Sequence, residues 1–400
     1  MSAPPFRLPP PPGGGVDLLV IAGEHSGDAH AARLVADLRR RQPGLRIAAL
    51  GGPALEAAGA QLLCDLTASS VVGLAEVLKN LAFFRRLFGA TVRWIEAHAP
   101  RAVCFVDYPG FNLRLARELR WRGLSAKGGG TIATIFYISP QIWAWKENRR
   151  FTMARDLDAI AVIFPFEVGS YADTVLPAAF VGHPFTAADH GLPVVYDPAG
   201  PVLLLPGSRK QAVARIFPVL LAGYRAFGGR PALVLYPSER IAAELRRRLA
   251  PGDAAAVTLA PVPEGAGAAL PASAVLTSSG TMSMQCALAG IPGAIVYRAN
   301  PLTYLLGRML VKVPFLGIAN LLLGEAMYPE YIQGAATPSA LAAELRACVG
   351  DLGRRARTAA QAARLRTALS QPTGDSAADW LARHLTAGGS IPLAEKPPPL

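Results

Sequence analysis

Short apolar runs alternate with helical patterns along most of the chain. Five runs in the first half have the length of a β-strand, namely Val16–Ala22, Arg46–Leu50, Arg101–Val106, Thr131–Ile138 and Ala159–Phe164. Helical patterns at Asp28–Arg41 and Phe111–Gly123 follow the first and third of them. This alternation predicts an α/β fold, in which helices cover both faces of a parallel sheet.

The pattern breaks near Val181–Pro198, where glycines and prolines accumulate, and a second series begins behind it. Its expected strands are Val202–Leu205, Ala232–Tyr236, Ser273–Thr277 and Gly293–Tyr297. Its expected helices are Gln211–Phe227 with an interruption at Pro218, Leu341–Val349, Asp351–Leu369 and Asp375–His384. We therefore expect two domains, residues 16–185 and 195–350, with a cleft between them and ligands at the carboxyl ends of the strands.

Composition adds limits to this picture. The chain has 400 residues, 52% of them hydrophobic, but no apolar run reaches the roughly 18–20 residues that span a bilayer. Residues 1–15 are rich in Pro and Gly and are expected to be a disordered arm rather than a signal peptide, and residues 387–400 a disordered tail.

The four cysteines lack metal or redox spacing, which suits a reducing cytoplasm. A net charge of +12 favours anionic partners.

Two loops at strand ends in the first domain are candidates for chemistry. The first strand ends in a glycine turn that contains Gly23, Glu24, Ser26 and Gly27. Backbone amides in such a turn can approach a ligand, although a plain tight turn with Asp28 near the helix start is an equal alternative.

The third strand ends at Asp107, whose carboxylate could act as a general base in a cleft or could cap the helix that starts near Phe111. After the next strand, Trp143 and Trp145 fit either a wall for sugar or acyl chains or ordinary packing. His183 at the domain junction is expected in a turn, with a ligand contact as the alternative.

The second domain opens with a possible anion site. Gly207, Ser208 and Arg209 directly follow its first strand, and Ser279–Thr281 begins a helix. A guanidinium group and free amides at a helix amino terminus can together hold a diphosphate.

The segment Leu78–Phe88 is both basic and apolar. It can lie on an anionic membrane surface or be a core-facing helix with charged edges. The residues that would touch the membrane are Leu78, Phe83, Phe84, Arg85, Arg86 and Phe88. No basic and aromatic motif indicates nucleic-acid binding, and no His, Cys and carboxylate cluster has metal spacing.

Taken in order, these motifs resemble the lipid-A-disaccharide synthase family from about Val16 to His384. The matching stretches are Ala22–Asp28, Gly73–Leu78, Asp107–Asn112, Tyr137–Trp145, Phe164–Glu167, Val181–Pro184, Leu204–Arg209, Ser279–Thr281, Tyr297–Arg298, Asn320–Leu322 and Pro329-Glu330 with Gln333. Each stretch is a weak signal alone, whereas the ordered set is specific.

The resemblance implies the GT-B architecture of two Rossmann-like domains, with helices at about 352–386 crossing back to the first domain. It implies an inverting transfer of 2,3-diacylglucosamine from UDP-2,3-diacylglucosamine to 2,3-diacylglucosamine 1-phosphate in lipid A biosynthesis, without metal or other cofactor. A cytoplasmic protein peripheral on the anionic inner membrane is expected, with no nucleic-acid partner; a homodimer is compatible with the sequence.

The resemblance also assigns roles to residues. Asp107 is the candidate base, and Arg209 with the helix start at Ser279–Thr281 would stabilise the departing diphosphate. The expected UDP-sugar contacts are Gly207, Ser208, Ser279, Gly280, Thr281, Gln285, Tyr297, Arg298 and Asn320. The expected acceptor contacts are Gly23, Glu24, Ser26, Gly27, Asn112, Ser139 and Trp143.

The chain departs from the family pattern at three positions. It has His25 where the family has Ala, Gly110 where the family has a second Asp, and Gln285 where the family has a Glu that accepts ribose hydroxyls. Gln can still accept through its carbonyl oxygen, so weaker UDP binding is expected. Ser125–Gly130 is expected to be an inserted loop. The departures leave two alternatives: a GT-B paralogue for another UDP-sugar, or a relative that binds nucleotide or lipid without catalysis.

Overall fold

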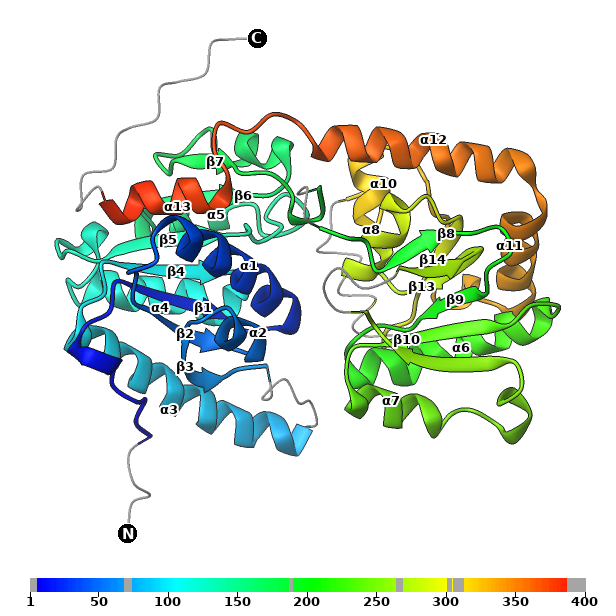
Figure 1. Cartoon of the computed structure of the whole chain (residues 1–400), viewed down its shortest axis with the longest axis horizontal. Coiled ribbons are helices and arrows are strands. Elements are labelled where there is room, and N and C mark those ends of the chain that lie inside the picture. Colours follow the sequence, from blue (N-terminus) through cyan, green and yellow to red (C-terminus); the bar gives the residue numbers. More distant parts are fainter. Residues whose placement is uncertain are drawn as a thin grey trace. The chain divides into compact units, whose positions relative to one another are not determined.

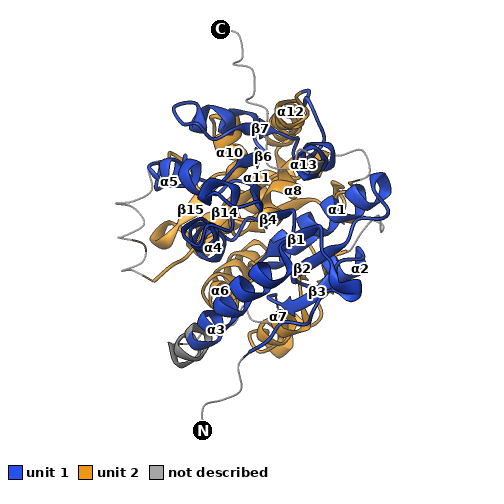
Figure 2. Ribbon diagram, turned by 90° about the vertical axis from the view of Figure 1, so that its left-hand side faces the viewer, with its two compact units in different colours: residues 1–184, 372–400 blue, residues 185–371 orange. Residues whose placement is uncertain are grey.

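The chain forms two compact units (Figures 1 and 2). The computed structural model describes residues 6–67, 74–186, 190–263, 269–300, 304 and 313–386, with the backbone only for 74–81. Unit 1 contains Met1–Pro184 and Pro372–Leu400, and unit 2 contains Phe185–Gln371. The boundary between the units therefore falls inside Val181–Pro198, where the alternation of strands and helices breaks.

Unit 1 is built on a seven-stranded parallel sheet of order β3-β2-β1-β4-β5-β6-β7. Its strands are β1 Leu18–Ala22, β2 Ile47–Gly51, β3 Gln61–Asp65, β4 Ala102–Val106, β5 Ala133–Tyr137, β6 Ala159–Val162 and β7 Ala178–Phe180. The residues of β1, β2, β4, β5 and β6 are all buried, as continuous apolar runs in a sheet covered on both faces require. The edge strands β3 and β7 are less buried, and the sequence pattern did not indicate them.

Two groups of helices cover this sheet. The helices are α1 His25–Arg41, α2 Pro53–Ala57, α3 Leu74–His98, α4 Pro109–Trp121, α5 Arg149–Asp156 and α13 Ala377–Thr386. One group contains α3, α4 and α5, and the other contains α1 with α2 and α13. The side chain of Arg41 on α1 donates to the Asp379 carboxylate on α13 at 2.7 Å, which ties the end of the chain to unit 1.

Unit 2 is also built on a parallel sheet, which has six strands in the order β11-β10-β9-β13-β14-β15. Its strands are β9 Val202–Leu205, β10 Ala232–Tyr236, β11 Val257–Pro261, β13 Ala274–Thr277, β14 Gly293–Tyr297 and β15 Glu330–Ile332, and β8 Val194–Tyr196 pairs with β12 Leu270–Ala272 in a separate two-stranded sheet. Its helices are α6 Lys210–Phe227, α7 Glu239–Arg246, α8 Thr281–Leu288, α10 Ile318–Leu323, α11 Pro338–Gly350 and α12 Leu352–Leu369.

The structure differs from the sequence-based expectations at two helices, α6 and α12. Helix α6 runs through Pro218 without the expected interruption, because a single missing N–H does not outweigh the packing of its buried face against α7 and α11. Helix α12 packs on α8, α10 and α11 within unit 2. The described return to unit 1 therefore starts at Pro372 and consists of α13, whereas residues from 352 onward were expected.

The amino-terminal arm is partly ordered, contrary to the expectation for residues 1–15. The indole Nε1–H of Trp94 donates to the Pro9 carbonyl at 2.8 Å, and the Gln61 amide donates to the Pro10 carbonyl at 2.8 Å. The ring of Phe6 meets Phe83 edge to face, with 5.7 Å between the centroids. Residues 6–15 are therefore attached to α3 and β3. Residues 1–5 and the expected tail 387–400 lie outside the described residues.

Each sheet has one place where the strand order reverses. In unit 1 this switch point lies between β1 and β4, and in unit 2 it lies between β9 and β13. Loops that leave neighbouring strands there run to opposite sides of the sheet and leave space for a ligand at the carboxyl ends. The glycine turn follows β1, Asp107 follows β4, Arg209 follows β9, and Ser279–Thr281 follows β13.

Candidate functional site

The two loops at the switch point of unit 1 are joined by Asn112. This side chain is fully buried, and its Nδ2 donates to the carbonyls of Ile21 at 3.3 Å and Asp107 at 2.7 Å. It therefore ties the end of β1 to the loop after β4. Asn112 was expected to contact the acceptor. In the structure its amide donates to backbone carbonyls of unit 1, so it supports the two loops.

The loop after β4 has a strained backbone at the candidate base. Asp107 and Tyr108 have φ of +47° and +49°, in a region that bulky residues rarely adopt. Tyr108, rather than Asp107, occupies the N-cap position of α4, and Asp107 directly precedes it. The Asp107 side chain is half-buried at the carboxyl edge of the sheet.

The glycine turn is shaped by the same tyrosine. A Cβ on Gly23 would lie 2.2 Å from the Tyr108 ring, so only glycine fits there. Burial and the nearby Glu24 carboxylate raise the pKa of Tyr108. Glu24 occupies the N-cap of α1 and Ser26 its first turn, both half-buried.

Asp28 lies in the first turn of α1, near the helix start as expected, and its carboxylate binds the start of a second helix. It is buried and accepts the backbone N–H groups of Gly52 at 2.8 Å and Ala54 at 3.0 Å. These groups lie at the start of α2, which begins at Pro53. Asp28 thus caps α2 across the edge of the sheet.

The loops after β5 and β6 contribute aromatic and acidic side chains. Ser139 is buried, and its hydroxyl lies 2.6 Å from the Tyr171 hydroxyl, so this expected acceptor contact is also used internally. Trp143 is half-buried and donates its Nε1–H to Glu167 Oε1 at 3.1 Å. Glu167 ends the family-matching stretch Phe164–Glu167, but no role was expected for it from the sequence.

In unit 2 the loops after β9 and β13 meet closely. Gly207 has a φ of +106°, and a Cβ there would lie 3.1 Å from the Ser278 hydroxyl oxygen. The Ser278 N–H donates to the Leu205 carbonyl at 2.8 Å, which continues the pairing of the two strands into the loops. Ser208 and Arg209 are exposed, and Arg209 occupies the N-cap of α6. The two loops that contain the expected anion-binding groups thus meet at the switch point of unit 2.

Helix α8 starts beside this loop pair. Gly280 and Thr281 are exposed at its amino terminus, while the Ser279 hydroxyl donates to the Leu316 carbonyl at 2.9 Å. One turn later the buried Gln285 has its Nε2 3.5 Å from His190 Nε2. The exposed start of α8 is therefore suited to an anion, and Gln285 lies on the same short helix.

Asn320, an expected UDP-sugar contact, makes hydrogen bonds inside unit 2. It is fully buried, and its Nδ2 donates to the Tyr328 carbonyl at 2.7 Å and to Glu330 Oε1 at 3.0 Å. Its Oδ1 accepts the Tyr328 N–H at 2.9 Å. The amide thus joins α10 to the segment before β15. Of the other expected contacts, Tyr297 at the end of β14 is half-buried and Arg298 is exposed.

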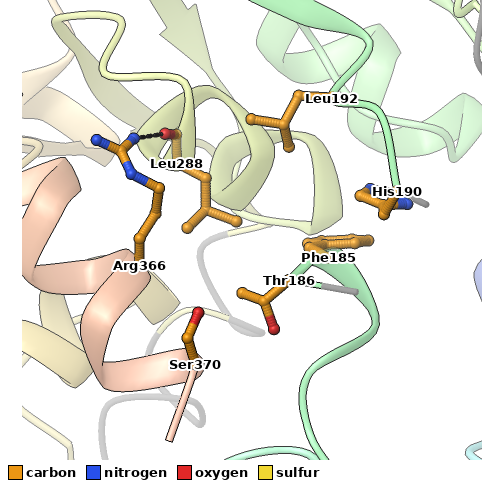
Figure 3. A pocket seen from close by; sticks show the side chains of 7 residues that line it. All are labelled: Phe185, Thr186, His190, Leu192, Leu288, Arg366 and Ser370. Atoms are coloured by element: carbon orange, nitrogen blue, oxygen red, sulfur yellow. Dashed lines mark hydrogen bonds between the residues drawn. The ribbon is translucent and has the colours of Figure 1, made fainter. Parts of the chain in front are cut away.

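A cavity of about 240 Å³ lies beside the far end of α8 (Figure 3). Its wall contains Leu288 from α8 and Arg366 from α12, whose guanidinium donates to the Leu288 carbonyl. On the opposite side the His190 ring stacks on Phe185, with 5.0 Å between the centroids. The cavity thus shares His190 with the Gln285 contact.

The expected membrane segment forms part of α3, and its aromatic residues face inward. Phe83, Phe84 and Phe88 are half-buried against the core of unit 1, and Phe88 meets Phe111 edge to face. Arg85 and Arg86 are exposed, and the side chain of Leu78 lies outside the described residues. Among the described residues, no helix has the length and apolar character that crossing a membrane would require.

Comparison with known proteins identifies the family. The family model described as lipid-A-disaccharide synthetase matches residues 18–384. The lipid-A-disaccharide synthase of Syntrophus aciditrophicus is 36% identical over 370 residues, which cover 89% of this chain and 94% of the relative. That of Geobacter sulfurreducens is 35% identical over 351 residues, covering 82% and 86%. The chain belongs to the lipid-A-disaccharide synthase family.

Solved structures agree with the fold of this family. The rice protein Os79, solved in complex with UDP, has a TM-score of 0.58 at 13% identity and covers 92% of this chain and 100% of its own. The glycotransferase of kitacinnamycin has a TM-score of 0.52 at 17% identity, with 92% and 99% covered. The chain thus has the GT-B architecture of two Rossmann-like units, and as a family member it is a glycosyltransferase.

The departures from the family pattern can now be placed in the structure. His25 is exposed as the first residue of α1, and Gly110 is exposed in the first turn of α4. A Cβ on Gly110 would meet nothing within 4 Å, so packing does not require glycine there. His183 is buried, and its ring lies 5.2 Å from that of Phe164, which is an aromatic contact within unit 1.

Proposed function

We propose that this lipid-A-disaccharide synthase family member transfers 2,3-diacylglucosamine from its UDP form to 2,3-diacylglucosamine 1-phosphate. The observation that carries the proposal is the family match over residues 18–384. The products are UDP and the β-1,6-linked disaccharide 1-phosphate of lipid A biosynthesis. The acceptor hydroxyl oxygen forms a bond to the anomeric carbon as the bond from that carbon to the diphosphate breaks.

Asp107 acts as the general base in this proposal. A base must take the proton of the acceptor hydroxyl as its oxygen attacks, and a carboxylate within hydrogen-bond reach does so. Three features support Asp107: its half-buried side chain, its strained backbone and its position at the switch point of unit 1. Asn112 supports this backbone through its bond to the Asp107 carbonyl.

Arg209 and the start of α8 stabilise the departing UDP. The negative charge on the diphosphate grows as the sugar leaves, so donors aimed at that oxygen lower the barrier. The exposed Arg209 guanidinium, the amides at Gly280 and Thr281, and the positive end of the α8 dipole supply such donors. No metal ion is needed for this proposal.

The central test uses purified protein with both acyl sugars in detergent, and measures UDP release and the disaccharide. Asp107→Ala is expected to lower kcat by about a thousandfold or more and to leave UDP binding within about twofold. Asp37→Ala, which removes an α1 carboxylate paired with Arg40, is the control and should retain activity. Loss of UDP binding together with activity would assign Asp107 a structural role instead.

Arg209→Ala tests the other half of the mechanism. It should lower both kcat and the affinity for UDP, by about tenfold or more in each case, because Arg209 faces the leaving group in the proposal. Arg246→Ala removes an exposed arginine paired with Glu239 on α7 of the same unit and is the matched control. Normal turnover by Arg209→Ala would contradict the assigned role.

Contact with the anionic inner membrane, from its cytoplasmic side, is the second part of the proposal. Both substrates carry acyl chains, and the exposed Arg85 and Arg86 on α3 supply positive charge. We expect sedimentation with vesicles that contain phosphatidylglycerol, and loss of most of this binding in Arg85→Glu with Arg86→Glu. Equal binding to neutral vesicles would contradict the electrostatic contact.

A further inference from the structure

Glu167 is a buried acid that the mechanism above does not use. It lies in the short helical turn Pro165–Tyr171 and is 1% exposed. Its Oε2 accepts the backbone N–H groups of Phe164 at 3.1 Å and Ile163 at 3.3 Å. Its Oε1 accepts the Trp143 indole N–H at 3.1 Å. One carboxylate therefore joins the loop after β6 to the loop after β5.

Burying the Glu167 carboxylate lowers the stability of the fold. A carboxylate loses most of its hydration when it is buried, and burial raises the pKa of Glu167 to about 7. An apolar side chain would occupy the same volume without that cost. It would not, however, determine which way the indole of Trp143 points, because orientation requires an acceptor aimed at Nε1.

The indole that Glu167 fixes belongs to an aromatic cluster at the carboxyl edge of the unit 1 sheet. Trp143 meets Phe166 edge to face, with 5.3 Å between the centroids, and Phe166 stacks on Phe164 at 5.8 Å. Phe166 is 46% exposed and Trp143 is half-buried, so the cluster presents a surface to solvent. Aromatic rings of this kind bind the apolar faces of sugars and acyl chains.

The same edge of the sheet carries Asp107. Strands β4 and β5 are paired in register, and the Asp107 N–H donates to the Tyr137 carbonyl at 3.1 Å. Trp143 follows six residues after Tyr137, in the loop that leaves β5. A sugar whose hydroxyl reaches Asp107 would therefore have the aromatic cluster as a neighbour within unit 1.

We propose that Glu167 is a positioning residue, which holds the Trp143 indole as a wall of the acceptor site. The inference rests on the proposed function, since it concerns how the acceptor binds near Asp107. Glu167 acts through Trp143 and takes no part in proton transfer.

The test uses the amide in place of the acid. In Glu167→Gln the amide has one acceptor oxygen and one NH₂ group, so it cannot accept all three N–H groups. Either Trp143 or the two backbone donors then face another donor. We expect KM for the acceptor to rise about tenfold, with kcat and KM for the UDP-sugar changed by less than about twofold.

A second variant keeps the buried acid and its backbone bonds. Trp143→Phe removes only the indole, so it should raise the acceptor KM by a similar factor while the unit stays folded. In this background the amide NH₂ can face the ring, so Glu167→Gln should add less than about twofold. Independent, multiplying effects of the two substitutions would overturn the proposal.

Matched controls remove the same chemical groups elsewhere in unit 1. Trp121→Phe alters a 68% exposed indole at the end of α4, and Glu118→Gln alters a carboxylate on α4 paired with Arg122. Both should leave the acceptor KM unchanged. If the wild type turns over and Glu167→Gln keeps a normal acceptor KM, the inference fails and the proposed function stands. If the wild type releases no UDP, both fail.

Discussion

The buried carboxylate of Glu167 predicts a specific pH dependence of stability. Burial raises its pKa from 4.5 to about 7, although the N–H groups of Phe164 and Trp143 act in the opposite direction. Between these two values the folded state binds more protons than the unfolded state. The free energy of unfolding must therefore fall as the pH rises through this window, and the contribution is largest on the acidic side.

The size of the effect follows from the same two values. A pKa difference of one corresponds to about 1.4 kcal/mol, so the change from 4.5 to about 7 is worth about 3 kcal/mol. Between pH 5 and pH 7 the contribution of Glu167 falls by about 2 kcal/mol. Because this side chain is 1% exposed, solvent screening does little to reduce the figure.

Tryptophan fluorescence measures this effect in unit 1 alone. The chain has five tryptophans, at positions 94, 121, 143, 145 and 380, and all of them lie in unit 1. Urea unfolding followed by their emission at pH 5 and pH 7 should give the stability of this unit for the wild type and for Glu167→Gln. The difference between the two proteins isolates one carboxylate, since all other titrating groups are shared.

A parallel pH dependence of stability in the two proteins would refute this prediction. If the stability of Glu167→Gln changes with pH in parallel with the wild type, Glu167 is not protonated in this window. Trp121→Phe provides the comparison, because it alters a 68% exposed indole and removes no titrating group, so its curve should be parallel to that of the wild type.

Three further predictions concern other parts of the chain. Gln285→Glu should tighten UDP binding by about fivefold in calorimetry, because a charged acceptor makes stronger hydrogen bonds with ribose hydroxyls; unchanged affinity would remove Gln285 from the ribose contact. Asn320→Ala should destabilise unit 2 by about 2 kcal/mol or more in chemical unfolding followed by circular dichroism, since it leaves buried backbone groups unpaired. Trp94→Phe removes the bond to the Pro9 carbonyl, so trypsin should cut after Arg7 faster than in the wild type, and an equal rate would mean that the bond does not anchor the arm.

The central strands and long helices were predictable because their signals are local. Val202–Leu205, Ala232–Tyr236 and Gly293–Tyr297 form strands with the bounds that the apolar runs predicted. The edge strands β7 and β15 were missed, because three-residue, half-buried strands leave almost no apolar run. Helix α6 continues through Pro218 because tertiary packing outweighs one local preference.

The candidate site was predictable at the level of loops but less so at the level of side chains. Asp107 and Arg209 lie at strand ends, as the sequence predicted, and the strand order places both strands beside a switch point. Asn112, Ser139 and Asn320 have the residue types of ligand contacts, yet each is buried with partners inside the protein. In the sequence, a polar residue that contacts a ligand cannot be told from one that bonds inside the protein, because its hydrogen-bond partners come from distant parts of the chain.

By itself the sequence determined the two α/β units, the family and the loops at the carboxyl ends of the central strands. These depend on periodicity and on ordered motifs, which are properties of neighbouring residues. The tertiary structure decided which polar groups make hydrogen bonds inside the protein. It also brought Trp143 and Glu167, which lie in two different loops, within hydrogen-bond distance. It also attached the Pro-rich arm to Trp94, since a carbonyl finds an indole 85 residues away only once the chain has folded.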